Sequence, residues 1–330
     1  MAYAKEILHR AEARLDEARR QNDLDCERRI AGIYEKLPRL QEIDRELRRT
    51  SAKVYAAAFR GSESPEQAME TLKQENLSLQ RERDWILESE DIDPEDLERE
   101  PVCKLCGGSG WRGAVMCECL RELCRQEQKK ALMQAFGAGK ETFEKFRLDV
   151  YPDRIDPKLG VSPRALMKKI YESAVSYTRT FSPGSGSLLF MGATGLGKTF
   201  LSGCIARAVA DKGYAVCYVS AGKLFSDFET EKFRLKEDGA LTQEYLETDL
   251  LIVDDLGTEM TTQFTVSALY QIVNGRLLAG KPTIVSTNLP DQELELRYSA
   301  QIASRLLGAY TLYQFCGEDV RLLKKMRNEG

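Results

Sequence analysis

Short apolar runs and longer periodic stretches alternate along the chain from about residue 140 onward. Runs in which most positions are apolar predict strands buried on both faces, whereas apolar residues three or four positions apart predict helices. The predicted strands are residues 187–191, 215–219, 250–254, 283–287 and 310–315. The helices between them include residues 198–212, 262–279 and 301–306. This alternation predicts an α/β fold, with a five-stranded parallel sheet and helices on both of its faces.

The first hundred residues follow a different pattern, because 43 of them are charged, compared with 30% of the whole chain. Apolar residues keep a three-four spacing in residues 30–47 and again in residues 69–86, which indicates two amphipathic helices. Pro38 should kink or break the first stretch, and a capping box at residues 64–67 should start the second. The pattern predicts a helical hairpin or short coiled coil, and an exposed helical spacer is the alternative.

A glycine-rich segment joins the first predicted strand to the helix at residues 198–212. Its residues are Gly192, Ala193, Thr194, Gly195, Leu196, Gly197, Lys198 and Thr199, with Phe200 directly after them. They match G-x-x-x-x-G-K-[ST] in the strand–loop–helix setting in which this pattern binds phosphate. Glycines let successive N–H groups turn inward around an anion, and the helix adds the positive end of its dipole. The segment predicts an ATP site, with Lys198 on the β- and γ-phosphates and Thr199 on Mg²⁺.

Polar residues end the predicted strands at residues 250–254 and 283–287. The carboxyl ends of strands are where open α/β sheets place their ligands. Asp254 is predicted to hold Mg²⁺, largely through water, and Asp255 to orient or deprotonate the attacking water. Asn288 is predicted to hold the same water and to sense the γ-phosphate. The alternatives are that Asp255 only caps the next turn and that Asn288 is an ordinary turn residue.

Composition and charge limit the remaining possibilities. The net charge of −4 argues against a wholly basic nucleic-acid coat, although it leaves room for a local basic groove. No run approaches the length of a membrane helix, and the N-terminus lacks the pattern of a signal peptide. We therefore expect a cytoplasmic protein without membrane contact. In that reducing compartment, nine cysteines favour metal binding over disulfides.

Four cysteines form a separate pattern in residues 101–126. Cys103 and Cys106 form a C-x-x-C pair, and Cys117 and Cys119 follow as C-x-C. Four thiolates at this spacing can hold one tetrahedral Zn²⁺, and the glycines between the pairs permit the turns that such a site needs. Cys124 is either spare or a substitute for one of the second pair. A redox pair or a packing role is the alternative to zinc.

Several short motifs narrow the class of the predicted ATPase. They are Glu141-Thr-Phe-Glu-Lys-Phe146, Val253-Asp254-Asp255-Leu-Gly257, Asn274-Gly-Arg276, Lys281-Pro-Thr-Ile-Val-Ser-Thr-Asn288-Leu and Ala303-Ser304-Arg305-Leu306. Together with the glycine-rich segment, they resemble the DnaC/DnaI-type AAA+ bacterial replicative helicase loaders and their IstB-like relatives. The resemblance covers roughly residues 101–325, including the cysteine cluster, which is similar to the zinc-binding region of DnaI-like loaders. The charged helical segment before it is not part of that pattern.

The resemblance implies roles for several arginines. Arg305 resembles the arginine finger that enters a neighbouring subunit's site and neutralises γ-phosphate charge in the transition state. Arg276 and Arg297 are weaker candidates, and a structural role for Arg305 beside a local carboxylate is the alternative. Few residues follow the last predicted strand, so a full helical lid domain is not expected. Arg321 would then supply the nucleotide contact that a lid otherwise brings.

The resemblance also implies contact with single-stranded DNA through a helical element after the second strand. Residues 223–236 interleave aromatic and basic side chains, among them Phe225 and Phe228, which suits stacking on bases and contact with phosphates. The same phenylalanines would equally suit the inner face of an amphipathic helix. Both readings remain open from the sequence.

The sequence therefore predicts four parts. Residues 1–100 form the helical hairpin or coiled coil, 101–126 the four-cysteine zinc-binding module, 127–160 a linker leading into the ATPase, and 161–330 the AAA+ domain. The implied function is ATP-dependent loading of the replicative DNA helicase. The implied partners are the hexameric helicase, single-stranded DNA and further copies of the chain. The rival functions are an IstB-like transposition helper and a nucleotide-binding adaptor without catalysis.

Overall fold

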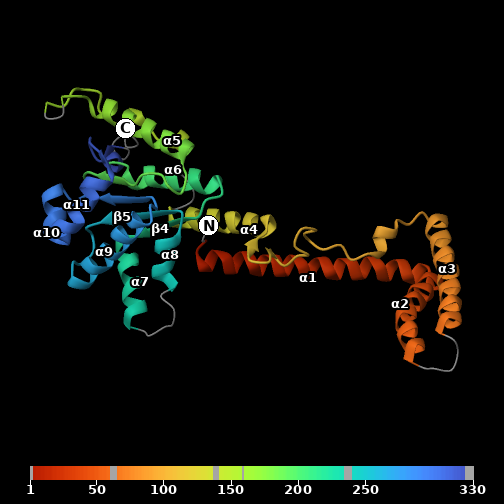
Figure 1. Cartoon of the computed structure of the whole chain (residues 1–330). Coiled ribbons are helices and arrows are strands. Elements are labelled where there is room, and N and C mark those ends of the chain that lie inside the picture. The colour runs from red at the N-terminus through yellow and green to blue at the C-terminus, as the bar shows by residue number, and fades with distance from the viewer. Residues whose placement is uncertain (1–2, 60–64, 137–140, 158–159, 234–239, 324–330) are drawn as a thin grey trace. The chain divides into compact units, whose positions relative to one another are not determined.

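The computed structural model describes residues 3–59, 65–136, 141–157, 160–233 and 240–323 (Figure 1). The chain forms two compact units. The helical unit is Glu12–Leu120, and the sheet unit consists of Met1–Ala11 together with Arg121–Gly330. The first residues belong to the sheet unit because the buried Tyr3 hydroxyl donates to Gly213 O at 3.2 Å and Glu244 accepts from Lys5 N.

The sheet unit is built on a parallel sheet with the strand order β4-β5-β6-β3-β7. The strands are β3 Leu188–Met191, β4 Val216–Ser220, β5 Leu250–Leu256, β6 Thr283–Thr287 and β7 Thr311–Gln314. Each coincides with a predicted strand within two residues at either end. The α/β fold with a five-stranded parallel sheet is therefore confirmed.

Helices cover both faces of this sheet, as predicted. The helices are α5 Pro163–Thr180, α6 Lys198–Asp211, α7 Ala221–Phe233, α8 Ala240–Glu247, α9 Gln263–Leu278, α10 Asp291–Tyr298 and α11 Ala300–Ala309, with the 3-10 turns η2 Phe143–Lys145 and η3 Leu148–Val150. Side chains of β3 alternate between the faces, because strand residues point to opposite sides in turn. Leu189 and Met191 pack with α7 to α11, while Leu188 and Phe190 pack with α5, α6 and the end of α4.

The helix α4, Glu118–Ala135, runs into the segment that we predicted as a linker. Its Gln128 bonds to the backbone around β4, donating to Tyr214 O at 2.8 Å and accepting from Val216 N at 2.9 Å. Backbone groups along an edge strand need such partners when they are buried. Gln128 thus helps to fix α4 to the edge of the sheet.

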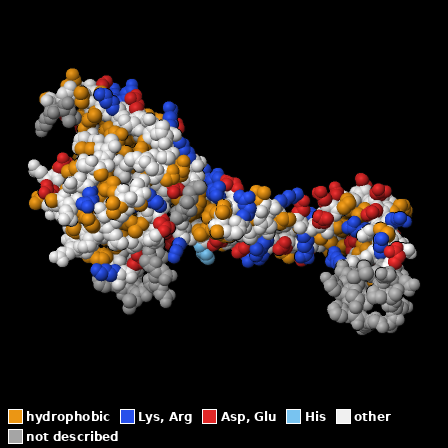
Figure 2. All heavy atoms as spheres, in the orientation of Figure 1, with side chains coloured by type: hydrophobic (Ala, Val, Ile, Leu, Met, Phe, Trp, Pro, Cys, Tyr) orange, Lys and Arg blue, Asp and Glu red, His pale blue; other side chains and the backbone are white. Residues whose placement is uncertain are grey.

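The helical unit contains α1 Lys5–Lys36, apart from its first residues, α2 Pro38–Phe59 and α3 Pro65–Ser89. Pro38 separates α1 from α2, as predicted, and stands at the first position of the new helix, where its missing N–H costs nothing. The predicted cap Ser64 lies outside the described residues. Charged side chains of both signs are interspersed over the visible face of this unit (Figure 2).

The helices α2 and α3 pack side by side as a hairpin (Figure 1). Leu40 and Ile43 of α2 are fully buried against Ile86 and Leu87 of α3. Two ion pairs also join the helices: Arg39 with Glu82 at 2.7 Å and Arg83 with Asp44 at 2.8 Å. The helical hairpin expected from the apolar spacing is present. Throughout the described residues, no helix combines the length and apolar character needed to cross a membrane.

Candidate functional site

The glycine-rich segment lies between the end of β3 and the start of α6, as the sequence predicts. Gly192 has φ 143° and Gly197 has φ 92°, which are angles that side-chained residues rarely adopt. Space is also limited at both positions. A Cβ on Gly192 would lie 2.6 Å from Phe315 O, and one on Gly197 would lie 2.9 Å from the Tyr151 hydroxyl. The loop conformation therefore depends on glycine, and its N–H groups precede the N-terminus of a helix, where anions bind.

Lys198 is the first residue of α6, and its side chain is buried against the loop. Its Nζ donates to Gly192 O at 2.6 Å and to Ala193 O at 2.8 Å. Burial lowers the pKa of Lys198, while the nearby carboxylates of Asp255 and Asp254 act in the opposite direction. Thr199 follows as the second residue of the same helix. The arrangement holds one positive charge at the loop, as a phosphate site requires.

The two aspartates stand at the carboxyl end of β5, next to Ser286 of β6. Asp254 is buried, its Oδ1 accepts from the Ser286 hydroxyl, and its Oδ2 accepts from the Tyr218 hydroxyl at 2.6 Å. Asp255 is exposed and has φ 55°, and its N–H donates to Ser286 Oγ at 2.9 Å. Although the side chain is exposed, the partial loss of water around its carboxylate and the charge of Asp254 raise the pKa of Asp255, while Lys198 and Arg321 lower it. A carboxylate with a raised pKa is a better proton acceptor than an ordinary one.

Asn288 lies at the same edge of the sheet. It directly follows Thr287, which pairs with Met191 of β3, and Thr287 O accepts from Gly192 N at 3.2 Å. The Asn288 side chain is exposed. Because β6 lies between β5 and β3, Asn288 stands between the aspartates and the glycine-rich loop. The structure therefore brings together the glycine-rich loop with its Lys198, the two aspartates and Asn288, which the sequence predicted to form the phosphate site.

Residues near the C-terminal end of the described chain contact the same loop. Val320 N donates to Gly195 O at 3.0 Å. Arg321 is near enough to Lys198 and Asp255 to lower the pKa of both. We expected Arg321 near the nucleotide from the resemblance alone, and its position beside Lys198 is compatible with that role.

A small pocket of about 70 Å³ adjoins the loop and was not predicted. Its walls are Lys145, Phe146, Arg147, Val150, Tyr151, Gly197, Phe200 and Val320. Tyr151 is fixed there because its hydroxyl donates to Leu196 O at 2.9 Å. Of these residues, only Gly197 and Phe200 were predicted to belong to the site. The aromatic residues of the motif at residues 141–146 were the feature of the sequence from which this pocket could have been predicted.

The three candidate arginines differ in their surroundings. Arg305 on α11 donates to Asn274 Oδ1 at 2.9 Å and to the Tyr270 hydroxyl at 3.1 Å, and its guanidinium lies over the Tyr270 ring. Its partners among the described residues are thus neutral, and the local carboxylate that we considered is not among them. Arg297 is exposed and reaches Gly257 O.

Arg276 cannot serve as an arginine finger, because its side chain is completely buried. Its guanidinium donates to Thr283 Oγ1 and to the carbonyls of Tyr245, Leu246, Thr248 and Pro282. Burial lowers its pKa to about 10. A charge held by backbone carbonyls in this way joins the end of α8, the end of α9 and the start of β6. Its role in this chain is structural.

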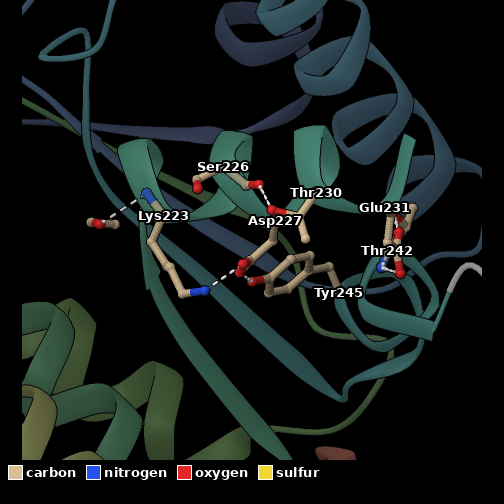
Figure 3. Close-up of polar contacts among 8 residues, drawn as sticks. Lys223, Ser226, Asp227, Thr230, Glu231, Thr242 and Tyr245 are labelled. Carbon is tan, nitrogen blue, oxygen red and sulfur yellow. Dashed lines mark hydrogen bonds and ion pairs between the residues drawn. The ribbon is translucent and has the colours of Figure 1, made fainter. Parts of the chain in front are cut away.

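Two of the phenylalanines proposed for base stacking face the core, whereas the side chain of Phe233 and residues 234–236 lie outside the described part of the chain. Phe225 and Phe228 are 4% and 6% exposed, and both lie on the face of α7 that packs against the sheet. Lys223 is paired with Asp227, which also accepts from the Tyr245 hydroxyl at 2.6 Å (Figure 3). Stacking of bases on these two rings is therefore wrong, and the amphipathic-helix reading is correct.

The cysteine cluster lies within the helical unit. The Sγ atoms of Cys103, Cys106, Cys117 and Cys119 lie within 4.8 Å of one another, which would suit a metal ion. A tetrahedral Zn²⁺ with ordinary Zn–S bonds places its sulfurs about 3.8 Å apart. The Cys103–Cys117 and Cys106–Cys119 distances are 3.9 and 3.5 Å. The donor set is therefore compatible with zinc.

Backbone hydrogen bonds shape this cluster. Gly110 N donates to Cys106 Sγ at 3.3 Å, and Cys117 N donates to Gly110 O at 2.8 Å. Although burial acts to raise it, hydrogen bonds from Gly110 N–H, from the Cys119 and Cys103 thiols and from Gly108 N–H lower the pKa of Cys106 to about 6. Cys124 is not in the cluster. It is buried on α4 in the sheet unit, near Tyr3.

A parallel sheet that gathers a glycine-rich loop, an Asp-Asp strand end and an Asn at one edge is characteristic of a P-loop ATP-binding domain. Residues 168–321 match the family model described as IstB-like ATP binding protein. This match agrees with the resemblance of the motifs to the DnaC/IstB-like group, and a DnaC loader is among the similar curated proteins.

Three curated proteins illustrate the similarity. The uncharacterized protein YqaM of Bacillus subtilis is 25% identical over 76% of this chain and 77% of its own length. An ATP-binding protein in an insertion sequence of Mycobacterium tuberculosis is 26% identical over 51% of this chain and 62% of its own length. The replicative helicase loader DnaC of Buchnera aphidicola subsp. Baizongia pistaciae is 24% identical over 42% of this chain. The chain spans 57% of that loader's length.

Proposed function

We propose that this protein hydrolyses ATP and uses it to load the replicative DNA helicase. The observation that carries the proposal is the convergence of Lys198, Asp254, Asp255 and Asn288 at one sheet edge, in a domain of the DnaC/IstB-like group. The cellular role proposed for this chain is taken from one relative, which is named a replicative helicase loader. The four-cysteine cluster favours a loader, because it resembles the zinc-binding region of DnaI-like loaders.

The residues of the phosphate site divide the work of hydrolysis. The loop N–H groups and Lys198 hold the phosphates, and Thr199 and Asp254 hold Mg²⁺. The metal ion, when bound, supplies positive charge that neutralises the phosphate oxygens. Asp255 orients the attacking water or accepts its proton, which its raised pKa supports. Asn288 holds that water from the neighbouring strand.

The unpredicted pocket beside the loop is proposed to take the adenine ring. Phe146, Tyr151 and Phe200 offer flat aromatic surface there, and Val320 adds an apolar side chain to the lining. Aromatic side chains can stack on any base, because every base has a flat π-face. The pocket is small, so we expect the Phe146 and Phe200 rings to separate when a base enters.

Two arginines are proposed to complete the site. Arg321 approaches the phosphates of its own subunit, close to Lys198. Arg305 acts on the nucleotide of a neighbouring copy, as arginine fingers do in self-associating ATPases. It would exchange its contacts with Asn274 and Tyr270 for the γ-phosphate. Self-association of the chain is therefore part of the proposal.

The helicase is proposed to bind the helical unit, through the four-cysteine cluster loaded with zinc. Exposed apolar residues on the cluster, Leu105 and Val115, provide a contact surface. Single-stranded DNA is proposed to meet the polar surface of α7, since Phe225 and Phe228 are buried. ATP would stabilise the assembled, DNA-bound state, and hydrolysis would release the loader.

A pull-down with the replicative helicase of the same cell tests the proposal. The full chain should capture the helicase in ATP and release it as ATP is hydrolysed, while Lys198→Ala should not respond to nucleotide. Adding the loader should also raise the amount of helicase on a single-stranded DNA circle. Failure to bind the helicase in either nucleotide state would contradict the loader assignment.

A role as a transposition helper is the second candidate, because one relative is an ATP-binding protein in an insertion sequence. A helper should bind the transposase encoded beside it and stimulate strand transfer in ATP. Binding to a transposase, together with no binding to the helicase, would favour this candidate. A nucleotide-binding adaptor without catalysis is separated from both by a phosphate-release assay, in which it would show no turnover.

A further inference from the structure

Tyr218 contacts the acidic residue proposed for Mg²⁺, although no motif identifies it. Its hydroxyl donates to Asp254 Oδ2 at 2.6 Å, and Ser286 donates to the other carboxylate oxygen. The three residues come from β4, β5 and β6, which are neighbours in the sheet. They point to the same face of it, because Tyr218 is paired with Ile252, two residues before Asp254, and Ser286 is two residues after Ile284. Asp254 is therefore held from both sides.

These two hydrogen bonds orient the Asp254 carboxylate but do not occupy all of its acceptor positions. An ionised carboxylate has two oxygens and about four acceptor positions, of which the two hydroxyls use about half. The remaining positions stay available to water around a metal ion. Mg²⁺ accepts little departure from octahedral geometry, so the orientation of an acidic ligand matters more for it than for larger cations. A donor that sets this orientation affects metal binding without touching the metal.

The Tyr218 ring is itself held in place. Phe136, directly after α4, packs on it with 4.1 Å between the ring centroids and 50° between the planes. The side chain also packs against the core on the α6 face of the sheet. Its hydroxyl thus has a fixed position relative to Asp254, unlike that of an exposed tyrosine.

We infer that Tyr218 is a positioning residue for ATP hydrolysis, which orients Asp254 for Mg²⁺. The inference rests on the proposed ATPase function. Removing groups that orient a metal ligand typically costs 10- to 100-fold in metal affinity or activity. We therefore expect a loss of this size when the hydroxyl alone is removed. Binding of nucleotide without metal depends on the loop and Lys198, and it should not change.

The chain offers a matched control in a second buried Tyr–Asp pair. The Tyr245 hydroxyl donates to Asp227 Oδ2, also at 2.6 Å (Figure 3). Asp227 is 6% exposed and Tyr245 is 5% exposed. This pair lies on the opposite face of the sheet, with α7 and α8. Tyr245→Phe removes the same group from the same kind of bond, away from the phosphate site.

The experiment compares the full-length protein with Tyr218→Phe and Tyr245→Phe. Binding of a fluorescent ATP analogue, mant-ATP, is titrated in EDTA and at increasing Mg²⁺, and urea unfolding checks that both variants are folded. Steady-state hydrolysis gives kcat and KM across the same Mg²⁺ range. Tyr218→Phe should need 10- to 100-fold more Mg²⁺ for half-maximal nucleotide binding and hydrolysis, with unchanged affinity in EDTA. Tyr245→Phe should match the original protein in both readouts.

The outcomes separate the inference from the function on which it rests. An unchanged Mg²⁺ requirement in Tyr218→Phe, or an equal shift in Tyr245→Phe, would overturn the inference. Binding of mant-ATP that does not depend on Mg²⁺ in the original protein would overturn it as well. If the original protein binds Mg²⁺ and nucleotide together but shows no turnover, the proposed hydrolysis fails. The Mg²⁺ titration of binding would still decide the role of Tyr218.

Discussion

Individual residues of the phosphate site should have separable effects on binding and turnover. Lys198→Ala removes the positive charge that the loop carbonyls hold in place, so tight ATP binding should be lost. Asp255→Asn keeps the size of an exposed side chain but removes the proton acceptor. This variant should bind ATP normally and lose turnover by roughly 10²- to 10⁴-fold, the usual contribution of a general base. Nucleotide titrations and phosphate release on both variants test these expectations.

Two results would contradict this division of roles. Unchanged ATP affinity in Lys198→Ala would remove the assignment of the glycine-rich loop. Normal turnover in Asp255→Asn would leave Asp255 as a residue that only shapes the turn after β5. Its φ of 55° makes that alternative physically reasonable, because Asp tolerates the left-handed region better than most residues.

For individual residues, the sequence could not predict the direction in which a side chain points. The phosphate loop was predictable because its function requires particular residues at fixed spacing, and the same holds for Asp254. Phe225 and Phe228 suited a core or a DNA surface equally, and only their packing beneath α7 decided between them. Tyr218 carries no motif, and its contact with Asp254 depends on the pairing of β4 with β5. Such a contact joins residues far apart in sequence.

Elements of the sheet unit were predicted closely, because buried strands give continuous apolar runs. The strand β6 matches its prediction at both ends. The whole of helix α4 was missed, because residues 118–126 were assigned to the four-cysteine module and 127–135 to a linker. Its surface is mainly polar and no cap marks its course. The first residues of α1 were assigned to the hairpin, whereas the contacts of Tyr3 and Lys5 place them in the sheet unit. Local pattern cannot show which unit a long charged helix joins.

Arg276 joins three elements, and its removal should destabilise the sheet unit. Arg276→Met fills a similar volume but leaves buried carbonyls at the end of α8 without donors. Unsatisfied buried groups and lost bonds to a charged donor should together cost about 3 kcal/mol or more. Urea unfolding measures the change.

Arg179→Met is the control for this loss, because Arg179 is exposed in the last turn of α5. Its stability should change by no more than about 0.5 kcal/mol. Arg276→Lys should lie closer to the methionine variant than to the original protein, since an ammonium cannot reproduce the planar fork of a guanidinium. A stable Arg276→Met variant would show that these carbonyls find other donors.

At the scale of the whole molecule, Arg305 should act between copies of the chain. Arg305→Ala should bind ATP normally and lose turnover on the order of 10³-fold, the lower range for arginine fingers. Mixing it with Asp255→Asn should restore some activity, because some interfaces then join an intact site to an intact finger. Phosphate release from the mixture measures this. Native mass spectrometry shows whether mixed assemblies form.

Contacts of Arg305 within its own subunit require a further control. Tyr270→Phe and Asn274→Ala weaken those contacts but keep the guanidinium. If Arg305 acts in a neighbouring site, both variants should retain most of their turnover. A mixture that stays inactive while mixed assemblies form, or equal losses in all three variants, would indicate a structural role.

The cysteine cluster should make one segment of the helical unit, residues 101–120, dependent on metal while the sheet unit remains folded. Cys103, Cys106, Cys117 and Cys119 should bind about one Zn²⁺ per chain. The backbone between the two cysteine pairs packs closely on α1 and α4, since a Cβ on Gly110 would lie 2.9 Å from Leu15 and 3.0 Å from Leu120. So short a segment buries little apolar surface, and metal binding should supply most of its folding free energy.

Cys106→Ser should therefore release zinc, unfold residues 101–120 and weaken helicase binding. The sheet unit has its own core, so mant-ATP binding should persist. Cys124→Ser should keep its zinc, because Cys124 lies outside the cluster. Metal analysis, limited proteolysis and the helicase pull-down measure these effects. Metal-free protein with a protease-resistant cluster would refute the zinc site. Unchanged zinc in Cys119→Ser, with zinc lost in Cys124→Ser, would instead make Cys124 the fourth ligand.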